Sequence, residues 1–310
     1  MRVARGQLTL DELSTQVAQL RRGPVEFRYE PRGAATVVVF HGGHMRAGLT
    51  LGEEVFADGG CSVLAVSRPG YGRTPLTAGA SPAAFADTTA ELCTHLGIDA
   101  VTAAVGASAG GPTAVAMAAY HPDLVQRLIL QSSVGPLPWP DRRTSVGARL
   151  VFAPGTEGMT WAAVHALVRL APDLGLRLLL RDLTVLPVRD MLAALQPEHR
   201  ARLVGLFSRM RSGHGFVLDL QALRTPTTLA HMAARICRPT LIIASRKDAA
   251  VPFPHAEALS SAIPGAELME SQADGHFVWF GRDWPSIAER IRVFLTRPET
   301  KPQLLRRPSE

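Results

Sequence analysis

Short apolar runs alternate along this chain with longer stretches in which apolar residues recur at helical spacing. Several short runs, such as TVVVF at residues 36–40, are apolar throughout or nearly so, which is typical of parallel strands covered by helices on both faces. The expected strands are 26–29, 36–40, 62–66, 101–105, 128–131, 240–244 and 267–270. The expected helices between them are 82–96, 111–120, 254–262 and 284–295. This alternation predicts an α/β protein with a mostly parallel central sheet and helices on both faces.

The alternation stops near Gly135 and resumes near Arg238. The segment between them has no convincing strand, and it carries helical patterns at 160–170, 174–180, 187–195 and 197–210. Because the strands on either side fit one sheet, the segment is expected to be an insertion rather than a separate domain. We therefore expect a core formed by residues 1–135 and 236–310, with residues 136–235 as a helical cap.

The composition narrows the class of protein. With 46% hydrophobic and 19% charged residues, the 310-residue chain is expected to fold around a large core. No apolar run reaches the roughly 18 residues that span a bilayer, and the first residues lack the apolar stretch of a signal peptide. The expectation is a soluble, cytoplasmic protein with no membrane partner.

The net charge of +6 comes from an arginine-rich composition. The basic residues are scattered rather than gathered into a stripe with interleaved aromatics, so solvated surface is favoured over nucleic-acid binding. Cys61, Cys93 and Cys237 are widely separated and lack the spacing of metal ligands, so they are expected to be buried thiols in a reducing compartment. No feature of the sequence indicates a particular oligomeric state.

A serine, Ser108, stands among very small residues in the sequence GASAG at 106–110. A strand is expected before this G-x-S-x-G sequence and a helix from Gly111, so it is expected to form the tight turn between them. Such a turn strains the serine backbone and brings strand and helix close together, which only small flanking side chains allow. The turn lifts the hydroxyl above the sheet, and the N–H of Ala109 points to where an oxyanion would form.

A serine nucleophile needs a base, a carboxylate to orient the base, and a second oxyanion donor. Each of these follows an expected strand. The HGGH sequence at 41–44, where N–H groups between small residues could supply the donor, follows 36–40; Asp248 follows 240–244, and His276 follows 267–270. Because open α/β sheets build their sites at the carboxyl ends of strands, these residues are expected to meet.

With these segments in this order, the chain resembles an α/β-hydrolase-fold protein with a helical cap, over residues 24–135 and 236–297. The segments that carry the resemblance are HGG (41–43), SRPGYGRT (67–74), GASAGG (106–111), HPDLVQRLIL (121–130), RPTLIIASRKDAAVP (238–252) and GHFVWF (275–280). Each is weakly specific alone, and their order and spacing make the resemblance strong. It implies that Ser108 is the nucleophile, His276 the base and Asp248 the orienting acid. It also implies that Gly43 and Ala109 donate to the oxyanion.

The chain departs from the family pattern at two positions. Ser67 stands where many relatives have aspartate, and Ser245 stands where a glycine usually precedes the acid motif. Neither position carries chemistry in the family, so the implied triad is unaffected.

Other polar residues have simpler explanations. His41 is expected to orient the oxyanion loop, His44 either lines the pocket or is exposed, and Asp274 is expected to cap its loop rather than serve as the triad acid. His214, His231 and His255 are expected at the surface. For Arg169, Arg177 and Arg181 the solvated face of the cap helices is favoured over the alternative, contact with a substrate carboxylate.

An intact triad favours a serine hydrolase that cleaves an ester, lactone, amide or related carbonyl bond through an acyl-enzyme. The cap is rich in Leu, Val, Ala and Met, so the expected substrate is an apolar or amphipathic small molecule. The alternative is a non-hydrolytic member of the fold, either a binding protein or a biosynthetic enzyme for cyclisation, acyl transfer or elimination. The triad requires no metal or organic cofactor, and no binding motif for one is visible in the sequence.

Overall fold

Eight strands form one sheet in the order β1-β2-β4-β3-β5-β6-β7-β8. The computed structural model describes residues 12–140, 151–153, 155–223 and 225–297. The strands are β1 Gln16–Leu20, β2 Gly23–Glu30, β3 Thr36–Phe40, β4 Ser62–Val66, β5 Ala103–Ala107, β6 Leu128–Gln131, β7 Thr240–Ser245 and β8 Glu267–Ser271. β2 pairs antiparallel with β1 and with β4, and every other pairing is parallel. The prediction of a mostly parallel sheet is confirmed.

β2, β7 and β8 extend beyond their predicted bounds, and two further strands differ from the sequence prediction. The strand expected at 101–105 begins at Ala103, because Val101 forms only an isolated bridge to Val125. β1 was not expected, and its single buried residue, Ala18, explains why it leaves no apolar run in the sequence. Among the described strands, β1 pairs only with β2, at the edge of the sheet.

Helices cover both faces of the sheet. The helices of the core are α1 Glu54–Asp58, α2 Pro82–His95, α3 Gly111–Tyr120, α11 Pro254–Ala262 and α12 Trp284–Thr296. Alternate residues of β3 point to opposite faces, as in any strand. Val38 and Phe40 join the apolar cluster beneath α2, α3 and α11, whereas Val37 and Val39 join the cluster beneath α1 and α12.

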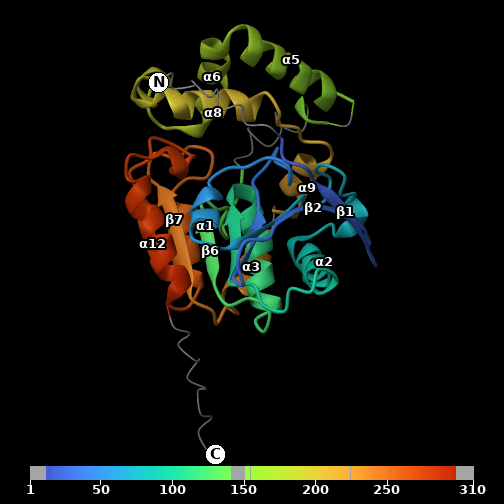
Figure 1. Cartoon of the computed structure of the whole chain (residues 1–310). Helices are drawn as coiled ribbons and strands as arrows, with labels where there is room; N and C mark the ends of the chain where they lie inside the picture. Colours follow the sequence, from blue (N-terminus) through green and yellow to red (C-terminus); the bar gives the residue numbers. More distant parts are fainter. Residues whose placement is uncertain (1–11, 141–150, 154, 224, 298–310) are drawn as a thin grey trace, which may run out of the picture.

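Among the residues described between β6 and β7, six further α-helices are present. They are α5 Glu157–Leu170, α6 Pro172–Leu180, α7 Val188–Ala194, α8 Pro197–Phe207, α9 Gly215–Ala222 and α10 Pro226–Ala233. α5, α6 and α8 lie together above the sheet in the view of Figure 1. α10 differs from them, because its Leu229 and Met232 belong to the same apolar cluster as α3. No helix among these described residues is long and apolar enough to cross a membrane.

Two expectations about burial are wrong. Cys61 and Cys93 are buried as expected, but Cys237 is exposed in the turn between α10 and β7. His255 was expected at the surface, yet it is only 4% exposed on α11. Its Nδ1 accepts a hydrogen bond from the N–H of Gly135, a contact between distant segments that residue spacing does not reveal.

Candidate active site

Ser108 directly follows β5 and begins the short helix Ser108–Gly110 that leads into α3. Its φ is +49°, in the left-handed region that non-glycine residues rarely adopt, so the expected backbone strain is present. A Cβ on Gly110 would lie 2.1 Å from the carbonyl oxygen of Phe40, so this position requires glycine. The small residues around Ser108 thus follow from the close approach of the turn to β3.

Asp248 and His276 come together although 28 residues separate them. Nδ1 of His276 donates to Oδ2 of Asp248 over 2.7 Å, and both side chains are buried. The other carboxylate oxygen, Oδ1, accepts the N–H groups of Ala250 (2.8 Å) and Val251 (2.9 Å). Because these donors fix the carboxylate, Oδ2 stays directed at His276, and an ionised Asp248 keeps the ring proton on Nδ1. Nε2 of the neutral ring is then left as an acceptor.

Ser108 and His276 are not hydrogen-bonded to each other. No bond between Ser108 Oγ and Nε2 of His276 is present among the residues that the structure describes. Catalytic hydrogen bonds are often long in unliganded enzymes and shorten when substrate binds. The hydrogen-bonded pair is therefore Asp248 and His276, and Ser108 lies on the turn after β5.

The HGGH segment lies against the serine turn. A Cβ on Gly42 would lie 2.9 Å from Cβ of Ser108, so the loop after β3 and the turn after β5 are in close contact. Within the described ranges, the N–H groups of Gly43 and Ala109 donate no hydrogen bond. Both donors are thus available to an external acceptor beside the serine.

His44 lies within a cluster of aromatic rings contributed by the helical insertion. Its ring centroid is 4.2 Å from that of Phe216, 4.8 Å from that of Phe152 and 5.3 Å from that of Trp161. Burial and the nearby charge of Arg68 lower the pKa of His44 to about 3, so the ring is neutral at physiological pH. Of the two uses expected for His44, this packing favours a pocket residue over an exposed one.

Two hydrogen bonds through Ser212 connect Trp161 to His44. The indole N–H of Trp161 donates to Oγ of Ser212 over 2.8 Å, and that oxygen lies 2.7 Å from Nδ1 of His44. Because the indole can only donate, the Ser212 hydroxyl keeps its own proton for a bond to Nδ1; in that arrangement the neutral ring carries its proton on Nε2.

His41 is held by a buried carboxylate. Its Nε2 pairs with Glu53, which also accepts a hydrogen bond from the guanidinium of Arg28. Burial alone would raise the pKa of the Glu53 carboxyl, but the charges and hydrogen bonds of His41 and Arg28 outweigh it and hold the pKa below its ordinary value. The His41 carbonyl accepts from Nε of Arg68 over 2.8 Å, so both the ring and the backbone of His41 are fixed.

Arg68 also links the core to the insertion. Its guanidinium binds both oxygens of Asp219 on α9, one of them at 2.8 Å. The hydroxyl of Tyr71 donates to the same carboxylate over 2.6 Å. Burial and the negative charge of Asp219 raise the pKa of Tyr71, so the phenol stays protonated and able to donate. These buried bonds fix α9 beside the loop that carries the HGGH segment.

The segment around Thr184 clamps the loops that carry Asp248 and His276. The carbonyl of Leu183 accepts the N–H of His276 over 2.8 Å, and Val185 N–H donates to the carbonyl of Lys247 over 2.9 Å. The hydroxyl of Thr184 donates to the carbonyl of Asp274. Three consecutive residues of the insertion therefore hold both loops. Nothing in the sequence indicated this contact.

Other polar residues singled out in the sequence lie outside the histidine–carboxylate pair. The carboxylate of Asp274 forms an ion pair with Lys247 (2.7 Å) and does not bind His276, so it is an ion-pair partner rather than the expected loop cap. Arg169, Arg177 and Arg181 are exposed, as expected. Over the described ranges, no group of three or more histidine, cysteine or acidic side chains could hold a metal ion.

The sequence missed Glu53, Asp219, Ser212 and Thr184. Each acts on residues far away in the chain, for example 151 positions between Arg68 and Asp219. The only available signal was the SRPGYG segment, which contains both partners of Asp219, Arg68 and Tyr71.

A strained serine thus follows β5, and a buried histidine–carboxylate pair is formed by residues after β7 and β8. Comparison with known proteins identifies the family. The model of the alpha/beta hydrolase fold family matches residues 35–283, so the chain belongs to this family. The resemblance noted in the sequence is confirmed.

Individual relatives agree with the family assignment. A hydrolase of Bacillus subtilis, YcgS, described as uncharacterised, is 31% identical over 88% of this chain and 95% of its own length. The 2-hydroxy-6-oxononadienedioate/2-hydroxy-6-oxononatrienedioate hydrolase of a Pseudomonas species is 26% identical over 82% of this chain and 86% of its own. The structure of an alpha/beta hydrolase fold protein from Nakamurella multipartita has a TM-score of 0.77, with 23% identity over 91% of this chain and 99% of that one. These relatives confirm that the chain is an enzyme of the α/β-hydrolase type.

Proposed function

We propose that the protein is a serine hydrolase that cleaves an ester, lactone, amide or related carbonyl bond of an apolar small molecule. Ser108 is the nucleophile, His276 the general base and Asp248 the orienting acid. The observation that carries this proposal is the Asp248–His276 hydrogen bond of 2.7 Å, which leaves Nε2 of His276 as the free acceptor of the ring. The strained backbone of Ser108 on the turn after β5 supports it.

The reaction follows from these positions. Nε2 of His276 takes the proton of Ser108 Oγ as this oxygen attacks the substrate carbonyl. The imidazolium that forms is stabilised by Asp248 and passes its proton to the leaving group, which gives an acyl-enzyme. Water activated by His276 then releases the acid and restores Ser108.

The N–H groups of Gly43 and Ala109 stabilise the tetrahedral oxyanion in this proposal. Neither N–H is used within the described ranges, and the loop that carries Gly43 contacts the Ser108 turn. Donors that are held in place before the reaction cost little reorganisation when charge develops on the oxygen. His41, fixed by Glu53 and Arg68, is a positioning residue for this loop.

The helices α5 to α9 act as a lid over this site. Trp161 on α5 and Phe216 on α9 pack against His44, next to the proposed oxyanion donor Gly43. Together with Phe152, they form an aromatic wall that favours an apolar substrate. α10 packs with the core, so the proposed lid ends before residue 226 rather than at 235.

The relatives do not select one bond type. One curated relative is named for the hydrolysis of a dienedioate and another, from Serratia proteamaculans, is named a putative carbamate hydrolase. The proposal is therefore limited to a carbonyl bond attacked by Ser108.

Covalent labelling tests the proposal directly. A fluorophosphonate requires an activated serine and a working oxyanion site, so it should label the Ser108 peptide of the wild type, as read by mass spectrometry. Labelling should be lost in Ser108→Ala and His276→Ala. It should persist in His121→Ala, a matched control whose histidine pairs with Asp87 at the surface.

Turnover of p-nitrophenyl acetate, butyrate and octanoate should follow the same pattern across these variants, and kcat/KM should rise with acyl length. A folded wild type that leaves Ser108 unlabelled and turns over none of these esters would contradict the proposal. Such a result would favour the non-hydrolytic alternative.

A further inference from the structure

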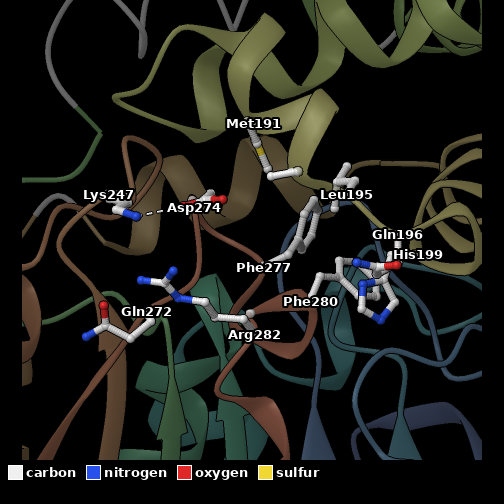
Figure 2. A pocket seen from close by; sticks show the side chains of 13 residues that line it. Met191, Leu195, Gln196, His199, Lys247, Gln272, Asp274, Phe277, Phe280 and Arg282 are labelled. Atoms are coloured by element: carbon white, nitrogen blue, oxygen red, sulfur yellow. Dashed lines mark hydrogen bonds and ion pairs between the residues drawn. The ribbon is translucent and has the colours of Figure 1, made fainter.

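A cavity of about 210 Å³ lies outside the proposed triad, between α7, the start of α8 and the loop that follows β8 (Figure 2). Ser108, Asp248 and His276 do not line it. Its residues nevertheless adjoin the triad in sequence, because Lys247 precedes Asp248 and Gly275 and Phe277 flank His276. The proposed chemistry gives this cavity no role.

One side of the cavity is apolar and aromatic. Met191 and Leu195, from α7 and its end, face the rings of Phe277 and Phe280 (Figure 2). The ring of His199 packs on Phe280 with 4.9 Å between centroids, and the Phe277 and Phe280 centroids are 5.9 Å apart. Flat aromatic faces of this kind bind rings and branched alkyl groups.

The other side carries an excess of positive charge. Lys247 and Asp274 form an ion pair there (2.7 Å), and Arg282 extends its guanidinium toward the same side (Figure 2). In the part of the chain that the structure describes, Arg282 has no ion pair or hydrogen bond. Two cations and one anion therefore line the cavity, and the guanidinium is available to a ligand.

We propose that this cavity is a second binding site, for a small carboxylate that carries an aromatic or branched apolar group. The apolar group packs against Phe277, Phe280 and Leu195. The carboxylate binds the fork of Arg282, a geometry that guanidinium groups match with two parallel hydrogen bonds, and lies within the field of Lys247. The volume is below the ~300 Å³ of drug-sized pockets, which limits the ligand to about one ring.

The site adjoins the loop of His276 through the backbone. The ligand contacts residues on both sides of His276, and the same loop is held from the insertion by Leu183 and Thr184. Occupancy is therefore expected to slow amide hydrogen exchange in residues 272–282 and in 191–199. This binding does not require the Ser108 chemistry.

Calorimetric titration of the full-length protein with phenylacetate, isovalerate and phenylacetamide tests the site. Phenylacetamide has the shape of phenylacetate without its charge, so it should bind at least tenfold more weakly. Arg282→Gln should weaken phenylacetate binding about tenfold and leave phenylacetamide unchanged. Arg292→Gln is the control, since Arg292 lies partly exposed on α12 outside the cavity, and it should bind as the wild type does. Leu195→Trp should fill the apolar side and abolish binding of both ring compounds.

The proposal is overturned if neither carboxylate binds, or if the acid and the amide bind equally. It is also overturned if Arg282→Gln and Arg292→Gln behave alike, or if ligand protects residues around Ser108 but not 272–282. Arg282 is exposed, so its substitution is not expected to affect folding, and this arm remains decisive if Leu195→Trp proves unstable in a thermal melt.

Discussion

Asp248→Asn provides the sharpest test of the proposed triad, because the hydrogen bonds around this side chain determine how asparagine must sit. In the wild type, Oδ1 accepts two backbone N–H groups and Oδ2 accepts Nδ1–H of His276. An asparagine that keeps its oxygen on the two N–H groups presents its NH₂ to His276. Nδ1 must then accept, the ring proton moves to Nε2, and the base for Ser108 is lost.

The expected loss of kcat follows from the free-energy cost of turning the new side-chain amide to the opposite orientation. With the amide reversed, the N–H groups of Ala250 and Val251 lose their acceptor. A buried donor left unsatisfied costs about 1–3 kcal/mol, so the productive form lies about 2–6 kcal/mol higher. At 1.4 kcal/mol per factor of ten, this lowers kcat between roughly 30-fold and roughly 10⁴-fold. The loss of charge stabilisation for the imidazolium moves the expected value toward the upper end, about 10⁴-fold.

Two measurements check this prediction. Initial rates with p-nitrophenyl butyrate give kcat, and ¹⁵N NMR of the His276 ring reports which nitrogen carries the proton. Asp274→Asn is the matched control, because Asp274 lies two residues from His276 and its carboxylate pairs with Lys247. The control should stay within about threefold of the wild type, since its side chain does not orient the base.

The reasoning is refuted if Asp248→Asn retains kcat within tenfold of the wild type while the protein stays folded. A larger loss in Asp274→Asn than in Asp248→Asn would move the orienting role to Asp274. A His276 ring that keeps its proton on Nδ1 in Asp248→Asn would show that the backbone donors do not fix the amide.

Two further predictions concern stability. Thr184→Val removes a hydroxyl that bonds one carbonyl and one N–H, so the free energy of unfolding should fall by about 1–3 kcal/mol in urea titrations. In the control Thr160→Val, the hydroxyl that is lost bonds an exposed carbonyl, so the free energy of unfolding should fall by less than about 0.5 kcal/mol. Equal losses in the two variants would argue against a stabilising role of the Thr184 contacts. Burial lowers the pKa of His44 to about 3 and also lowers the pKa values of His165 and His255, so the unfolded chain binds more protons once the pH drops below about 6.5. The stability that these neutral rings contribute is therefore present above pH 6.5 and should decline as the pH falls toward 4.5. An unfolding free energy that stays level over this range would contradict the prediction. So would a decline in His44→Asn as large as that of the wild type.

The sequence by itself determined several strands and the tight turn at Ser108. β3, β4 and β6 begin and end where the apolar runs do, because strands buried on both faces must be apolar throughout. The Ser108 turn was equally visible, since a close approach such as that of Gly110 to Phe40 excludes every larger residue. Asp248 and His276 could be placed at one edge of the sheet because parallel strands end together.

Only the tertiary structure decided how these side chains are held. Thr184, Asp219 and Ser212 lie in the helical insertion, and each contacts a core segment far away in the chain. Ordinary threonine, aspartate and serine residues leave no pattern that distinguishes such contacts from solvated surface. The edge strand β1 and the core position of α10 were missed for a related reason, because one sparsely buried strand and one short helix carry too little periodicity to show where they pack. Periodicity is a property of neighbours in sequence, whereas a hydrogen bond across the fold depends on distances that only packing sets.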